Sequence, residues 1–389
     1  DSFIHEAKEN NPQVQQAYQL WKAAEYKIQS VASLDDPQAT YSWFDEEIQT
    51  RVGPQEQKVG LSQKIPFPGK LSLKAQAQSK HAQILKEAYI AVLRDVTESV
   101  KFTFYDLYWV DHAIQIANEE KDILSKTEKV AQRGYESNVV AQQDVVKIQV
   151  ELSQIIQKQL MLNQNRKGLA VKLNTLLNRI EQTPIEKILN INKRLFKKDL
   201  KEILEKAENS RQELIAANLL VKKSEFEKSL AQMEYLPDFT VGAEYTDVGS
   251  GETSLLNDGE DAWLGKISVN VPLWFQKLNA QVQEKDAKLQ AAELHRSQVK
   301  NQVKYEAQDL YFKITSYKDI VLLYETAILP QAEQAFDSSQ VGFETGSVTF
   351  LDWLDAERTY LKTRLAYYKA IADYHKSYAR LERIVGVDL

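Results

Sequence analysis

Two very long stretches of the sequence consist of helix-forming residues with almost no interruption. Residues 70–132 and 276–340 are rich in Ala, Gln, Lys, Glu and Leu, and together they contain one proline, Pro330. A helix of about 60 residues runs ~90 Å, at a rise of about 1.5 Å per residue. Such a helix cannot curl back into a globule, so it needs a helical partner along its length. The sequence therefore predicts long helices that pack side by side as antiparallel coiled coils.

Further helices are expected around these two stretches. A second long helix follows each of them after a short break, at 140–178 and 350–385, and shorter helical segments span 2–34 and 199–234. The scarcity of breakers, with 13 glycines and 9 prolines in 389 residues, agrees with long helices. In the last helix, apolar residues recur every three or four positions, which predicts one buried stripe: Leu351, Leu354, Leu361, Leu365, Tyr368 and Ala372.

The order of these segments repeats after about 200 residues, the kind of internal period that marks a duplicated architecture. Residues 10–13 (Asn-Asn-Pro-Gln) correspond to residues 209–212 (Asn-Ser-Arg-Gln). Later, residues 134–137 (Gly-Tyr-Glu-Ser) correspond to residues 342–345 (Gly-Phe-Glu-Thr). Because the matches keep their order and nearly constant spacing, we expect two tandem repeats.

We expect the first repeat to cover residues 1–190 and the second residues 191–389. Residues 181–198, with Pro184 and the basic pairs Lys193-Arg194 and Lys197-Lys198, form the link between them. Each repeat reads as a helix, a β-hairpin and two long helices joined by a tip, with hairpins at about 37–66 and 237–273 and tips at about 134–142 and 342–350.

Four segments in the two hairpins alternate between apolar and polar residues, as strands do. In the first segment the apolar residues Ala39, Tyr41 and Trp43 alternate with polar residues, and in the fourth segment Ile267 and Val269 do the same. Each segment is about ten residues long, which is the length that a tilted strand needs to cross a bilayer. Aromatic residues gather near the segment ends, and as membrane-interface residues we select Trp43, Phe67, Trp263 and Trp274.

An ordinary antiparallel sheet with one packed face and one wet face alternates in the same way. Against that alternative, each hairpin lies between long helices, and the sequence has no separate apolar helix suited to cover such a sheet. Four strands cannot close a barrel, and open strand edges are not tolerated in lipid. A bilayer location therefore requires several copies of the chain to share one barrel.

The composition excludes several other classes. Charged residues make up 27 % and the mean hydropathy is −0.45, which excludes a helical membrane protein. The net charge of −6 gives no support to nucleic-acid binding. The chain has no cysteine and its five histidines are isolated, so we expect no metal site, no cofactor and no catalytic residues. The acidic loop 257–261 lacks the spacing of a calcium loop and reads as an extracellular loop.

Because the sequence starts at Asp1 without an apolar leader, we expect a removed signal peptide or a trimmed start.

These features together resemble the TolC-like outer-membrane factors, the exit ducts of tripartite efflux pumps and type I secretion systems. The resemblance covers the whole chain. It is most specific at the Asn-Pro start of the first helix, at the strand exit Pro66-Phe67-Pro68-Gly69-Lys70, and at the second tip, where an aromatic residue and a Thr-Gly turn precede an Asp-x-x-Asp pattern. The strand exit resembles the heavy-metal cation efflux branch more than the multidrug branch.

The resemblance implies a mainly α fold with a small β part. In such proteins, long antiparallel coiled-coil helices form an α-barrel, and four strands per protomer contribute to a shared trimeric twelve-stranded transmembrane β-barrel. It implies a passive channel in the outer membrane of a Gram-negative bacterium, with a large periplasmic portion. Its partners would be two further copies, a periplasmic adaptor (membrane fusion) protein, an inner-membrane pump of the RND or ABC type, and outer-membrane lipid.

The resemblance also assigns a channel constriction. Asp352 and Asp355 lie on one helix face and match the acidic pair near the periplasmic mouth of TolC. Three copies would bring six carboxylates into one cation-attracting ring; the alternative is a solvated helix face with charges favoured by the helix dipole. Phe343 matches an aromatic residue that holds the mouth shut, without the tyrosine hydroxyl, and Val348 replaces an arginine. The first-repeat equivalents, Asp144 and Lys147, do not repeat the acidic pair, so we expect three-fold rather than six-fold symmetry at the mouth.

The two tips are implied to meet the adaptor, and its docking would splay the inner helix pairs and open the mouth. The tip residues selected for this contact are Gly134, Ser137, Asn138, Val139, Val140, Gly342, Thr345, Gly346, Ser347 and Val348. The alternative function is a soluble coiled-coil scaffold or periplasmic adaptor protein whose hairpins form a small packed sheet. The duct should need detergent for extraction, whereas the scaffold should not. An enzyme finds no support in any residue constellation.

Overall fold

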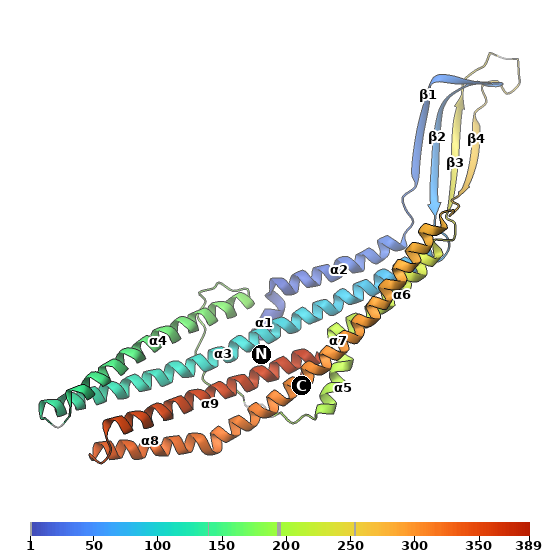
Figure 1. Cartoon of the computed structure of the whole chain (residues 1–389). Helices are drawn as coiled ribbons and strands as arrows, with labels where there is room; N and C mark the ends of the chain where they lie inside the picture. The colour runs from blue at the N-terminus through green and yellow to red at the C-terminus, as the bar shows by residue number, and fades with distance from the viewer. Residues whose placement is uncertain (1, 139, 193–195, 253) are drawn as a thin grey trace. The chain divides into compact units, whose positions relative to one another are not determined.

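The computed structural model describes residues 2–138, 140–192, 196–252 and 254–389 (Figure 1). Asp1, Val139, Lys193 and Arg194, which the sequence interpretation used, lie outside the described residues. The chain divides into two units, and each contains parts of both expected repeats. The helical unit comprises Asp1–Ala17, Tyr89–Gln212 and Lys300–Leu389, and the strand unit comprises Tyr18–Ala88 and Glu213–Val299.

The helices agree with the segments expected from the sequence, except for one correction near the start of each repeat and an interruption in the second long stretch. They are α1 (Ser2–Asn10), α2 (Pro12–Ala32), α3 (Lys70–Glu136), α4 (Gln142–Leu176), α5 (Leu200–Ser210), α6 (Gln212–Met233), α7 (Phe275–Leu323), α8 (Leu329–Glu344) and α9 (Phe350–Val385). The single helices expected at 2–34 and 199–234 are each two helices. The buried Asn11 causes the first break, because its side-chain oxygen accepts the backbone N–H of Gln13 at 2.9 Å and starts a new helix at Pro12.

The helical unit is built from two long antiparallel hairpins, the C-terminal part of α3 with α4, and α8 with α9 (Figure 1). An apolar cluster joins all four helices near their tips, and its buried members include Leu124 of α3, Ile148 of α4, Phe336 of α8 and Leu354 of α9. Leu354, Leu361 and Ala372 confirm the predicted stripe of α9. Leu351 does not belong to it, since its side chain is 50 % exposed while Phe350 and Trp353 face inward.

The second long helical stretch is interrupted, unlike the first. Between α7 and α8 a π-helical turn spans Tyr324–Ile328, and the N–H of Leu329 is donated to the carbonyl of Tyr324. Pro330 follows directly and has no N–H to continue the regular α-helical pattern, which gives the interruption its cause. At the matching place in the first repeat, α3 continues without a break.

The strand unit contains one antiparallel sheet of β1 (Gln38–Thr50), β2 (Gly53–Ile65), β3 (Phe239–Val248) and β4 (Ala262–Val269), in the order β1-β2-β3-β4. The two predicted hairpins therefore join through β2 and β3, where Val59 lies opposite Tyr245. β1 continues seven residues past Trp43, after a register shift between Trp43 and Ile48, so Trp43 does not mark a strand end. β4 ends at Val269, four residues before the predicted end of the second hairpin at about 273.

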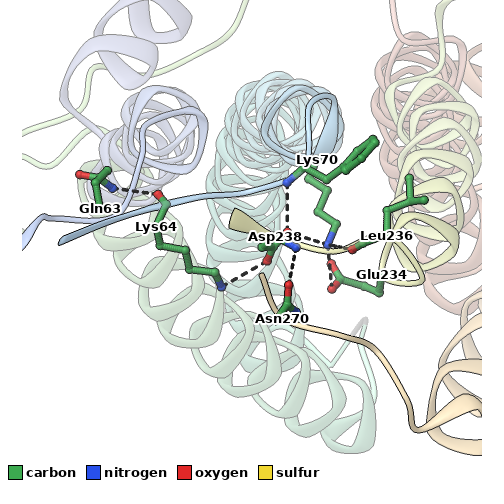
Figure 2. Close-up of polar contacts among 8 residues, drawn as sticks. Gln63, Lys64, Lys70, Glu234, Leu236, Asp238 and Asn270 are labelled. Carbon is green, nitrogen blue, oxygen red and sulfur yellow. Dashed lines mark hydrogen bonds and ion pairs between the residues drawn. The ribbon is translucent and has the colours of Figure 1, made fainter. Parts of the chain in front are cut away.

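A buried lysine joins the sheet to the helices of the strand unit (Figure 2). Gly69 adopts a φ of +101°, which favours glycine, and lets the chain turn from β2 into α3. Lys70 follows at 2 % exposure, and its ammonium donates to the carbonyl oxygen of Leu236 at 3.0 Å and to the carboxylate of Asp238 at 2.8 Å. The strand exit of the first repeat is thus tied to the strand entry of the second.

Candidate functional site

The first tip (residues 134–142) and the second tip (residues 342–350) have the same backbone design. Each helix ends in a residue with left-handed backbone, Asn138 at φ +58° and Gly346 at φ +78°. One residue earlier, the hydroxyl of Ser137 donates to the carbonyls of residues 133 and 134, and the hydroxyl of Thr345 donates to those of residues 341 and 342. These hydroxyls act as additional donors to carbonyls at the helix end that also accept backbone N–H groups.

A glycine and a valine close each tip. The N–H of Val140 donates to the carbonyl of Gly134 at 3.2 Å, and the N–H of Val348 donates to that of Gly342 at 3.1 Å. A Cβ on Gly134 would lie 2.5 Å from a methyl group of Val140, and one on Gly342 would lie 2.4 Å from a methyl group of Val348. Both tips therefore require glycine at this position, which accounts for the Gly repeat in the sequence.

The two tips differ in how the following helix starts. Thr349 caps α9, because its hydroxyl oxygen accepts the N–H of Asp352 at 3.3 Å and its hydroxyl also contacts the Asp352 carboxylate at 2.6 Å. Ala141 precedes α4 and offers no side-chain cap. The Asp352 carboxylate thus accepts the hydroxyl of the residue that caps its own helix.

The acidic pair is exposed on the surface of the single chain. Asp352 and Asp355 both present their side chains to solvent on α9. Their counterparts in the first repeat, Asp144 and Lys147, approach each other at 3.8 Å and neutralise one another. Among these residues the net negative charge therefore lies on the second hairpin, as a three-fold ring would require. That the acidic pairs of three copies meet in such a ring stays a prediction.

Phe343 packs inside the protomer. Its ring stacks on Trp353 with centroids 5.5 Å apart and contacts Phe350 at 6.0 Å. Val348 packs against the same apolar cluster, and so does Val140 of the first tip. The structure thus brings the two tips to one apolar cluster and leaves Asp352 and Asp355 outside it.

One residue near the tips was missed by the sequence interpretation. Glu357 lies two turns into α9 at 1 % exposure, and burial raises the pKa of its carboxyl to about 8. A sequence signal was present, because Glu357 stands in the apolar stripe between Leu354 and Leu361. A charged residue at a stripe position indicates either a partner or a function.

The predicted membrane-interface residues all lie in the strand unit, two within the sheet and two at a second level beyond its strand ends. Trp263 pairs with Tyr245, and Trp43 lies opposite Gln57 in the neighbouring part of the sheet. Phe67 and Trp274 lie at the other level, beside the starts of α3 and α7. The three tryptophans are at least 70 % exposed.

The sheet has one apolar and one polar face. Tyr41, Val59 and Tyr245 lie in one row across neighbouring strands, and Val241 and Ile267 lie in another row on the same face. Several of these side chains are largely exposed, Ile267 at 78 %. The opposite face carries polar residues, among them Glu244, which contacts Lys58 at 3.8 Å and Lys266 at 2.8 Å.

No group of three or more His, Cys, Asp or Glu side chains that could hold a metal ion occurs in the part of the chain that the structure describes. In the same part, none of the helices combines the length and the apolar character that crossing a bilayer requires.

Comparisons with known proteins agree with this architecture. A family model described as outer membrane efflux protein matches residues 3–179 and 203–387, one stretch in each half. The chain is similar to the outer membrane protein VceC of Vibrio cholerae, with 18 % identity, a TM-score of 0.82, and 100 % of this chain and 96 % of that chain covered. It is also similar to the CmeC outer membrane channel of Campylobacter jejuni, with 13 % identity, a TM-score of 0.84, and coverage of 99 % and 85 %. These likenesses show a shared fold and confirm the predicted fold class.

A short segment resembles a further protein. Over 59 residues the chain is 39 % identical to the cobalt-zinc-cadmium resistance protein CzcC of Cupriavidus metallidurans. The segment covers 15 % of this chain and 14 % of that protein.

Proposed function

Because the chain belongs to the outer membrane efflux protein family, we propose that it is the exit duct of a tripartite export system in a Gram-negative outer membrane. The family and the fold are those of channels, not of enzymes. The duct passes substrates from the periplasm or the pump to the exterior and uses no energy of its own. Family membership confirms the resemblance to the TolC-like outer-membrane factors and favours the duct over a soluble scaffold.

The observation that carries this proposal is the uncovered sheet. Its apolar face is exposed at residues such as Val59 and Ile267, and the outer edges of β1 and β4 pair with no strand among the residues that the structure describes. A lipid environment would solvate the apolar face but cannot satisfy the edges. Pairing β1 of one copy with β4 of the next satisfies them, and three copies of four strands give a closed twelve-stranded barrel.

The aromatic levels fit the thickness of a membrane. Val59 lies opposite Tyr245, the partner of Trp263, and Phe67 lies eight residues farther along the chain. At about 3.3 Å per residue this separation is about 26 Å along the strand, or about 20 Å of membrane height at the usual strand tilt of about 40°, which is comparable with the apolar band of about 25 Å in outer-membrane barrels. The polar face with Glu244 then lines the lumen, and β1 and β2 extend beyond the outer aromatic level.

The tips form the periplasmic mouth in this proposal. The paired turns at 134–142 and 342–350 meet a periplasmic adaptor protein, which links the duct to an inner-membrane pump of the RND or ABC type. Asp352 and Asp355 from three copies narrow the mouth and attract cations. Support for this assignment comes from their exposure on α9 and from the neutral pairing of Asp144 with Lys147.

Two measurements test the proposal together. Light scattering of the detergent-extracted protein should give the mass of a trimer, and single-channel recording in a planar bilayer should show pores. A monomer or dimer that is soluble without detergent and does not conduct would contradict the duct and favour the scaffold.

We further propose divalent metal cations as cargo. The segment similar to CzcC and the Pro66–Lys70 strand exit favour this class of substrate. Loss of the gene should then reduce growth in cobalt, zinc or cadmium salts, and its return should restore growth. Unchanged metal tolerance together with new sensitivity to organic drugs would overturn the assignment of cargo and leave the duct itself intact.

A further inference from the structure

Glu357 is a buried carboxyl group at the seam between the two helical hairpins. It belongs to α9, where it is 1 % exposed, and its Oε1 atom has no hydrogen-bond donor among the described residues. One turn earlier on the same helix, the buried indole nitrogen of Trp353 has no acceptor among them either. A buried polar atom without a partner is costly, so its presence needs an explanation.

The charges that face Glu357 come from three helices and do not neutralise it. α3 contributes Glu120, α4 contributes Glu151 and Lys158, and α9 contributes Arg358. Lys158 pairs with Glu120 at 2.9 Å, and Arg358 pairs with Glu151. Both cations are thus engaged with other carboxylates, which leaves Glu357 as the third acid of the group.

This environment favours the neutral acid. Burial disfavours the ionised form most, and the neighbouring carboxylate of Glu120 adds to that effect, so the pKa of Glu357 rises from 4.5 to about 8. At neutral pH the group therefore holds a proton as long as α9 stays against the α3–α4 hairpin.

We propose that Glu357 is a proton-binding site that couples pH to the opening of the periplasmic mouth, an inference that rests on the proposed function. With its proton, Glu357 is a neutral side chain within the packed seam. Without it, a third negative charge lies beside Glu120 and Glu151, and the α8–α9 hairpin moves away from the α3–α4 hairpin until water reaches the carboxylate.

The direction of the pH effect follows from linkage. The pKa is raised in the closed seam and returns toward its ordinary 4.5 when water reaches the group. Closing therefore takes up a proton between these two values, so the closed state is favoured at low pH and loses stability as the pH rises toward about 8. Above that pH both states are ionised and no further change is expected.

The first repeat provides a matched control. The spacing that relates Gly134 to Gly342 also relates Gln149 to Glu357. Gln149 is neutral and its side chain is exposed on α4. The α3–α4 hairpin therefore lacks this proton site, and a trimer would hold three of them.

The test compares the pH dependence of channel opening in planar bilayers for the wild type, Glu357→Gln and Gln149→Glu. In the wild type, the ratio of open to closed states should rise with pH by up to about tenfold per pH unit for each protomer that opens, and it should level off above about pH 8. Glu357→Gln, which keeps the shape and cannot ionise, should stay largely closed with a flat profile. Gln149→Glu adds an exposed charge and should keep the wild-type profile.

Infrared spectroscopy of the purified protein gives a second readout that does not depend on conductance. A protonated carboxyl band should titrate near the pKa of Glu357 and disappear in Glu357→Gln. Three results would each overturn the inference. The wild type could form pores whose opening does not depend on pH, Glu357→Gln could show the same pH dependence of opening as the wild type, or the infrared band could be absent. Absence of pores at every pH would instead overturn the proposed function, and the infrared titration would still decide the proton site.

Discussion

The ammonium nitrogen of Lys70 lies 2.8 Å from Oδ1 of Asp238, at the point where the sheet meets its helices. The same carboxylate oxygen accepts the backbone N–H of Phe67 at 3.0 Å, and its other oxygen contacts Lys64 at 3.3 Å. One buried ion pair therefore joins the end of β2 in the first repeat to the start of β3 in the second.

Removal of the Lys70 ammonium should destabilise the strand unit strongly. Lys70→Met leaves the Asp238 carboxylate, whose side chain is 12 % exposed, without its closest cation. Loss of one partner of a buried pair costs about 3 kcal/mol or more. Thermal unfolding of the detergent-extracted protein should show this loss. Lys74→Met, at an exposed position of the same helix, is the control, and equal losses for the two variants would contradict the account.

The same ion pair predicts acid sensitivity. Partial burial opposes ionisation of Asp238, but hydrogen bonds from Lys70, Phe67 and Lys64 outweigh it and lower the pKa of Asp238 below its ordinary 3.8. A lowered pKa stabilises the fold above pH 3.8, and that stabilisation is lost as the pH falls through the lowered value. Asp238→Asn should reduce the slope of stability against pH in this acidic range. An unchanged slope would show that other carboxylates dominate.

The second tip predicts a mutation with a specific rescue. Gly342→Ala places a methyl group 2.4 Å from a Val348 methyl and should cost about 1–3 kcal/mol through overpacking. Val348→Ala should relieve the clash, so the double variant should regain adaptor binding and stability. Binding of purified adaptor and thermal unfolding check both effects. A double variant no better than Gly342→Ala would refute the assigned contact.

The acidic pair predicts cation-dependent conductance. Asp352→Asn with Asp355→Asn should remove the negative charge at the mouth, reduce cation selectivity, and weaken block by multivalent cations. Asp144→Asn with Lys147→Gln removes the neutral pair at the first-repeat counterpart; this matched control should leave the block unchanged. If the double aspartate variant keeps the cation selectivity and the multivalent-cation block of the wild type, the two residues only form part of a solvated helix face.

The sequence predicted most of the architecture because its strongest signals are local. The alternation around Tyr41 and Ile267 indicated strands, and the glycines at 134 and 342 marked the tips. The length of β1 was underestimated because the acidic residues 45–47 and the register shift after Trp43 interrupt the alternation. The π-helical turn at Tyr324–Ile328 was missed because Pro330 alone does not specify which hydrogen bonds rearrange.

The candidate site was less accessible from sequence. The exposure of Asp352 and Asp355 agrees with their predicted place on the helix, but the inward packing of Phe343 on Trp353 depends on tertiary contacts. The place of Glu357 in the apolar stripe of α9 was a signal that the interpretation overlooked, but the charges around it lie largely on α3 and α4, and no pattern within α9 reports them.

In the proposed trimer, neighbouring copies close the open edges of the sheet, and cysteine cross-linking between β1 and β4 tests this pairing. The chain has no cysteine, so Ser42→Cys on β1 can be combined with one cysteine at Ala262, Leu264, Lys266 or Ser268 on the same face of β4. Disulfide formation in one register should give covalent dimers and trimers, which reducing agent dissolves, while Ser42→Cys alone gives none. If none of the cysteine pairs gives disulfide-linked dimers or trimers in the membrane-embedded protein, the shared barrel is contradicted.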